Sequence, residues 1–188
     1  MPVQAPKRLF TVREFHQMAK ADVFLAGDRV ELLAGEIVEM TPIGSRHAAC
    51  VKRLNAMLSS RLGSSMIVSV QDPIELGEHS EPQPDLAVLR FKAHFYRDAH
   101  PGPEDVLLVV EVADTSADVD RGVKVPLYAR AGIPETWVID LTDRMIDVYG
   151  APGHAAYAEH RRLRPDEVLI LSLPGGPTVE IRVKDLID

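Results

Sequence analysis

Four charged residues stand in segments whose apolar neighbours would ordinarily exclude charge. Glu111 follows the aliphatic run 106–110, Glu31 lies inside a short apolar run, Asp85 follows a proline at the start of another, and Lys124 lies in an apolar helical stretch. A buried carboxylate is costly unless it is paired or bound to a cation. Phosphodiester hydrolysis with Mg²⁺ needs hard oxygen ligands, an activated water and a positive charge near the phosphate. Several carboxylates with one lysine therefore predict a hydrolytic Mg²⁺ site.

Each residue also has a structural interpretation. An isolated Glu such as Glu31 is usually a salt-bridge residue, and Asp85 could simply begin a turn or strand. Lys124 could pair with Asp120, one helical turn earlier. Glu111 resists such an explanation because the residues just before it are all apolar. The order and spacing of the four residues, rather than any one of them, carry the prediction.

That order resembles a known nuclease pattern. Pro84 and Asp85, followed by a strand that ends near Glu111, resemble the PD-(D/E)XK nuclease superfamily. Four segments resemble, more specifically, the Uma-type family of bacterial restriction endonucleases: "DRVELLAGEIVEMTPIGSRH", "PQPDLAVLR", "LLVVEVADTSADVDRGVKVPLYARAGIPETWVID" and "DVYG". The resemblance runs from about Phe10 to Tyr149, roughly three quarters of the chain.

The resemblance implies a restriction-endonuclease-like fold, Mg²⁺ or Mn²⁺ as cofactor, and DNA as substrate. It implies that Asp85 and Glu111 ligate the metal and that Glu31 is a third acidic ligand. The superfamily carries a lysine two residues after the second acid, but Ala113 stands there in this chain. Because the Uma-type pattern has a lysine on the following helix, the resemblance points to Lys124 as the catalytic amine.

His47 lies four residues before Val51, on the apolar face of an expected helix. An inward histidine is more often a hydrogen-bonded core residue than a functional one. The family has a histidine at this motif position, and the inward face looks toward Glu31. The resemblance therefore implies that His47 supports the site, with Gln71 and Gln83 as further candidate partners of the acids.

Hydrophobic spacing and turn residues predict the elements that position these residues. A capping box of Thr11 and Glu14 begins the first helix, Ser45 is the expected N-cap of the second, and Gly132 ends the third. The second and third helices span 46–62 and 117–131, and a short helix at 184–187 closes the chain. Strands are expected at 30–33, 37–40, 66–71, 74–76, 85–89, 106–112, 136–140, 145–149, 161–163, 168–172 and 179–183. The pattern predicts an α/β, or mixed α+β, fold with a mixed central sheet flanked by helices.

Composition limits the class of protein. The chain has 188 residues and a net charge of −7, so DNA contact must rely on local basic patches. One cysteine excludes an internal disulfide and fits a reducing cytoplasm, and the seven histidines show no zinc-binding spacing. No apolar run approaches the roughly 20 residues that span a bilayer. We expect a cytoplasmic protein with no membrane association and one domain over 1–188, comprising a motif core at 10–149 and a β-rich extension at 150–188.

The sequence predicts a Mg²⁺- or Mn²⁺-dependent DNA endonuclease. The alternative is a non-catalytic nucleic-acid-binding or regulatory module that retains the fold, which the acidic charge and Ala113 favour. A hydrolase of another phosphodiester would share the same site. A homodimer is expected because cutting both strands of a duplex needs two sites related by a twofold axis, with the strands after Tyr149 as the interface.

Overall fold

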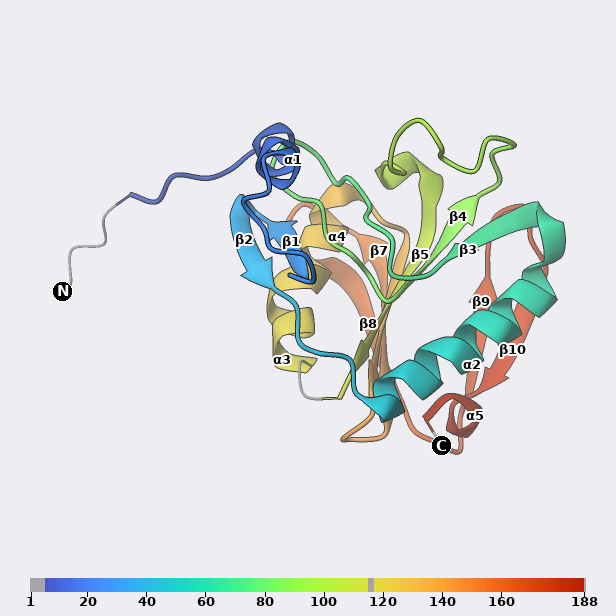
Figure 1. Ribbon diagram of the computed structural model, residues 1–188. Coiled ribbons are helices and arrows are strands. Elements are labelled where there is room, and N and C mark those ends of the chain that lie inside the picture. Colours follow the sequence, from blue (N-terminus) through green and yellow to red (C-terminus); the bar gives the residue numbers. More distant parts are fainter. Residues whose placement is uncertain (1–5, 115–116, 188) are drawn as a thin grey trace.

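The structure, a computed structural model, describes residues 6–114 and 117–187 and centres on a six-stranded sheet. The strands lie in the order β3-β4-β5-β6-β7-β8 (Figure 1). Their bounds are Met66–Ser69, Leu86–Arg90, Val106–Ala113, Glu135–Asp140, Met145–Pro152 and Tyr157–Leu163, with short 3₁₀ turns at Gly63–Ser65 and Pro103–Asp105. Only the β5–β6 pair of this sheet is parallel. The predicted mixed sheet is confirmed.

The central strand β5 is buried along its whole length, which explains its aliphatic sequence. Val110 faces a core cluster that it shares with α2 (Ser45–Leu62). Val109 faces a second cluster, which it shares with α4 (Val125–Ala131). Helices therefore cover both faces of the sheet. Because side chains alternate along a strand, Glu111 points to the same face as Val109.

The C-terminal strands pack into the core beneath α2. β9 (Val168–Ser172) and β10 (Thr178–Arg182) form an antiparallel hairpin whose residues alternate between buried and exposed. The inward side chains join the α2 cluster together with α5 (Lys184–Ile187), and Figure 1 shows the hairpin beside α2. On the outward face, Val168 and Ile170 are exposed.

The N-terminal elements form a smaller layer at one end of the molecule (Figure 1). This layer consists of α1 (Val12–Lys20) and the antiparallel hairpin β1 (Val30–Leu33) with β2 (Glu36–Glu39). The backbone of Leu32 exchanges two hydrogen bonds with that of Glu81. This pairing fixes β1, which carries Glu31, beside the segment that leads into β4.

The ends of the helices largely follow the sequence. Thr11 and Glu14 form the predicted capping box, and Gly132 ends α4 in the left-handed conformation. Ser45 is not the N-cap of α2 but its first helical residue, and Gly44 takes the cap position in an extended conformation. Glycine is also an acceptable N-cap, which explains the shift by one residue. No helix in the described ranges is long and apolar enough to cross a membrane.

Residues 74–76, expected to form a strand, pair with none of the described strands. Instead, Ile74 N–H donates to the carbonyl of Pro82 and Leu76 N–H donates to that of Ser80. The segment therefore folds back on the chain that follows it. Pro73 before it has no N–H to donate to a sheet, and the backbone N–H groups of Ile74 and Leu76 are taken by the returning chain, so the apolar pattern misled the prediction.

The crossover between the parallel strands β5 and β6 departs from a regular helix. It contains, in order, α3 (Ala117–Val119), a π-helical segment (Asp120–Lys124) and α4. Val125 N–H donates to the Asp120 carbonyl, five residues earlier, and Pro126 follows with no N–H of its own. Such widened turns are frequent at functional sites. Here the widened turn ends at Lys124.

Candidate active site

All five residues predicted for the site line one cleft of about 370 Å³. Glu31 comes from β1, His47 from the first turn of α2, Asp85 from the residue before β4, Glu111 from β5, and Lys124 from the end of the π-helical segment. Four of the five are buried, and the His47 side chain is only 13% exposed. The five side chains come from five separate segments of the sequence, and the fold brings them together in one cleft.

The ammonium group of Lys124 lies between two carboxylates. Its Nζ is 3.0 Å from Oε1 of Glu31 and 3.3 Å from Oε1 of Glu111. Burial alone would lower the pKa of this lysine, but Glu111, Glu31 and Asp120 outweigh burial and raise the pKa. Lys124 is therefore positively charged at neutral pH.

Glu111 is a buried acid whose ionisation is disfavoured. Burial raises its pKa to about 8, against the lowering effect of Lys124, and the carboxylates of Asp120 and Asp85 add to the rise. The Tyr128 hydroxyl donates to Oε1 of Glu111 at 2.6 Å. Tyr128 was not among the residues predicted for the site, although it lies four residues after Lys124 and so on the same helix face. A divalent cation would favour the ionised form of such an acid.

Asp85 is held by three partners. Its Oδ2 accepts the backbone N–H of Val112 at 2.9 Å and lies 2.9 Å from Nε2 of His47. Its Oδ1 accepts a hydrogen bond from the Gln71 side chain at 3.3 Å. Nδ1 of His47 is buried and has no hydrogen-bond partner in the part of the chain that the structure describes. A neutral imidazole has one donor and one acceptor, so the donor belongs on Nε2, facing Asp85.

Glu31 connects the N-terminal hairpin to the rest of the site. Its Oε1 pairs with Lys124, and its Oε2 accepts the backbone N–H of Gln83 at 3.0 Å. Gln83 lies two residues before Asp85, so Glu31 also braces the segment that delivers the aspartate. Both glutamines suggested by the sequence contact the acids, Gln71 through its side chain and Gln83 through its backbone.

The acids of the cleft suit a hard divalent cation by their chemistry, because Mg²⁺ and Mn²⁺ prefer carboxylate oxygens. Leu86 pairs with Val110 across the antiparallel strands. Asp85 and Glu111 therefore occupy adjacent positions on neighbouring strands. Within the described residues, no three acids of this cleft have ligand atoms within 4.8 Å of one another. They are held instead by the ion pairs and hydrogen bonds described above.

The fold and this cleft define the class of protein. A mixed sheet with helices on both faces, and acids with a lysine beside its central strands, is a restriction-endonuclease-like arrangement. A solved structure has the same fold: the crystal structure of "a putative nuclease belonging to DUF820" from Anabaena variabilis ATCC 29413 matches with a TM-score of 0.69. It is 15% identical in sequence, and the match covers 95% of this chain and 97% of that chain.

The chain belongs to the Uma2 family, described as "Putative restriction endonuclease", whose family model matches residues 12–183. The resemblance inferred from the sequence is therefore confirmed. The match continues past Tyr149 and includes the strands β8, β9 and β10. A search of curated proteins gave no match. Family and fold together support a nuclease.

Proposed function

We propose that the protein is a Mg²⁺- or Mn²⁺-dependent DNA endonuclease in which Lys124 supplies the catalytic amine. The observation that carries this proposal is the position of the Lys124 ammonium, 3.3 Å from Glu111 and 3.0 Å from Glu31. The same cleft contains Asp85. Two acids on adjacent strands and one charged lysine are the groups that metal-assisted phosphodiester hydrolysis needs.

In this proposal, Asp85 and Glu111 hold the metal ion and Glu31 is the third acid. When bound, the ion polarises the phosphate and lowers the pKa of a coordinated water. His47 donates a hydrogen bond to Asp85 and so fixes the orientation of that carboxylate. Lys124 orients the attacking water and offsets the negative charge that develops on the phosphate.

The packing around Ala113 supports the proposal that Lys124 takes the place of the lysine expected at position 113. Ala113 is fully buried and packs against Val125 and Val138. A lysine side chain at this position would displace the helix that follows the π-helical segment. The small residue at 113 instead allows that helix to approach β5, and Lys124 then enters the cleft from the helix side.

DNA as substrate is supported by local basic charge near the cleft. Arg29 lines the cleft, and Arg46 lies next to His47, pairs with Asp114 at 3.1 Å and has 61% of its side chain exposed. The sequence of α2 contains no acidic residue. Phosphate contacts by such side chains position a nucleic acid without reading its sequence.

The direct test is cleavage of supercoiled plasmid and of single-stranded DNA by the purified protein in Mg²⁺, Mn²⁺ or EDTA. We expect cleavage that requires the metal and that is lost in Asp85→Asn and Glu111→Gln. Lys184→Ala, an exposed change on α5, is the matched control and should cleave like the wild type. Cleavage that persists in EDTA would contradict the proposal. DNA binding without cleavage would favour the non-catalytic module.

Cutting both strands of a duplex also leads us to propose a homodimer. The outward face of β9 carries Val168 and Ile170, which are 47% and 51% exposed. We expect light scattering to give twice the mass of one chain at micromolar concentration, and Ile170→Lys to shift that mass toward the monomer. A wild-type mass equal to one chain would argue against the dimer.

A further inference from the structure

A second group of metal-ligating side chains lies outside the acid–lysine cleft. His16 from α1, Glu81 from the segment before β4 and His100 from the loop after β4 each offer one ligand atom, and these atoms lie within 4.8 Å of one another. It is the only such group of three in the ranges that the structure describes. Neither the family resemblance nor the proposed nuclease mechanism uses any of these residues.

Backbone hydrogen bonds hold the three segments in place. Val12 N–H at the start of α1 donates to the Glu78 carbonyl. Glu81 exchanges two hydrogen bonds with Leu32. Glu75 N–H donates to the carbonyl of Pro101, the residue after His100. The scaffold of this group is therefore fixed independently of any bound ion.

The buried carboxylate of Glu81 has few partners in this group. The Glu81 carboxylate is buried, and both of its oxygens lie 2.9 Å from Nε2 of His16. His16 is the only side chain of the described residues that hydrogen-bonds to this carboxylate. Its own side chain is 40% exposed, and its ring centroid is 6.2 Å from that of His100. A buried carboxylate is costly without a positive partner, and a bound cation would supply one.

We propose that His16, Glu81 and His100 bind a divalent transition-metal ion of the Zn²⁺ class, with a fourth position open to water. Two imidazoles and one carboxylate suit Zn²⁺ and its neighbours, whereas Mg²⁺ prefers oxygen ligands alone. Bonds of about 2.0–2.1 Å place tetrahedral ligand atoms about 3.3 Å apart. In the present structure His16 Nε2 lies 2.9 Å from the Glu81 oxygens, slightly inside that value, and all three ligand atoms lie within 4.8 Å of one another.

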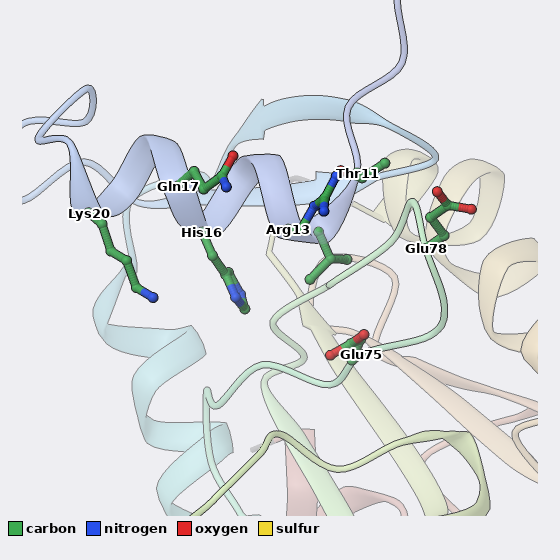
Figure 2. Close-up of a pocket in the computed structure, with 8 residues that line it drawn as sticks. Thr11, Arg13, His16, Gln17, Lys20, Glu75 and Glu78 are labelled. Atoms are coloured by element: carbon green, nitrogen blue, oxygen red, sulfur yellow. The ribbon is translucent and has the colours of Figure 1, made fainter.

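One member of this group, His16, also lines a pocket beside α1. A pocket of about 480 Å³ lies beside α1 and is lined by His16, Lys20, Glu75 and Glu78, among others. Figure 2 shows the His16 side chain projecting from α1 on the same side as Lys20, above Glu75. Because His16 is 40% exposed and His100 is exposed, the open coordination position can face solvent.

A bound ion would join α1 to the segment that delivers the catalytic acids. Glu81 pairs through its backbone with Leu32, the neighbour of Glu31, and lies four residues before Asp85. The ion would thus brace the N-terminal layer against the sheet. This role does not depend on nuclease activity, so the proposal can fail or succeed independently of the proposed function.

The test is a titration with Zn²⁺, followed by isothermal calorimetry and by the visible absorption of Co²⁺, which intensifies in a four-coordinate site. Because the acid cleft also offers carboxylates, the titrations use an Asp85→Asn, Glu111→Gln background. We expect one equivalent of Zn²⁺ to bind. His16→Ala and His100→Ala should each weaken binding by well over tenfold, because even removal of an outer partner of a metal ligand costs about 10–100-fold.

The matched control is His94→Ala, which removes an exposed histidine from the same loop as His100. It should bind Zn²⁺ like its parent. Circular dichroism in the absence of metal verifies that each variant is folded. The proposal is overturned if the background protein takes up no Zn²⁺, or if His16→Ala and His100→Ala bind as tightly as His94→Ala.

Discussion

The acid–lysine cleft and the His16–Glu81–His100 group both contain buried carboxylates, but they stabilise these carboxylates in different ways. In the cleft, the chain supplies its own cation, because Lys124 lies between Glu31 and Glu111. In the histidine group, the hydrogen-bonding partner of the buried Glu81 carboxylate is the imidazole of His16.

This difference suggests a division of tasks between the two regions. The cleft keeps a permanent positive charge where a phosphate would approach, whereas the histidine group leaves room for a cation from solution. Both regions depend on the segment 77–85, which pairs with β1 and continues into Asp85. A displacement of the backbone in one region can therefore move residues of the other region through this segment.

Removal of the lysine should have the largest effect. Lys124→Ala should reduce DNA cleavage by about 10²–10³-fold, because a charge positioned against a developing oxyanion contributes on that scale. It should also lower the free energy of unfolding by about 3–5 kcal/mol, since the buried Glu31 carboxylate loses its charged partner. Cleavage rates and urea unfolding measure the two effects. Cleavage at the wild-type rate would reduce Lys124 to a structural ion-pair residue.

Glu111 should make the stability of the metal-free protein depend on pH. The folded state raises its pKa from 4.5 to about 8, so the folded state binds the proton more tightly than the unfolded chain. The stabilisation by protonated Glu111 is present below pH 4.5 and is lost as the pH rises toward 8. The loss approaches about 1.4 kcal/mol per pH unit.

Urea unfolding in EDTA at a series of pH values measures this dependence. The difference between wild type and Glu111→Gln isolates the contribution of the single carboxyl group. We expect the wild type to lose stability relative to Glu111→Gln as the pH rises. Parallel curves for the two proteins would show that Glu111 is not the titrating group.

The thermal stabilisation by Mn²⁺ should depend on the acid–lysine cleft and not on the histidine group. Mn²⁺ at a hundred times its dissociation constant should stabilise the wild type by about 2.7 kcal/mol, and Asp85→Ala should abolish the shift. Lys124→Ala should retain it, because the acids remain. His16→Ala should leave the Mn²⁺ shift intact. Equal Mn²⁺ shifts in wild type and Asp85→Ala would place the Mn²⁺ elsewhere.

The smallest effect is expected from Tyr128→Phe. This change removes the 2.6 Å hydrogen bond to Glu111 without changing the apolar ring. Loss of one buried hydrogen bond should cost about 1–3 kcal/mol, and the pKa of Glu111 should rise further because this bond lowers it. Chemical unfolding at two pH values tests both effects. Unchanged stability at both would mean that the carboxyl finds another donor.

Short-range patterns determined much of this protein. The capping box of Thr11, the C-cap at Gly132 and the buried strand β5 were all readable because each depends on neighbours in the chain. The family motifs likewise indicated Asp85 and Glu111. The apolar pattern at 74–76 gave a wrong prediction, because the backbone of this segment hydrogen-bonds to the chain that returns along it instead of to a strand.

Tertiary structure alone decided which side chains meet. The π-helical segment brings Lys124 to Glu31, and α4 sets Tyr128 against Glu111; spacing places the two side chains on one helix face but does not say which acids they meet. The histidine group shows this most clearly, because its three members come from separate segments and match no metal motif. Sequence fixes local geometry through neighbouring residues, whereas a site built from distant segments exists only once backbone pairing has brought those segments together.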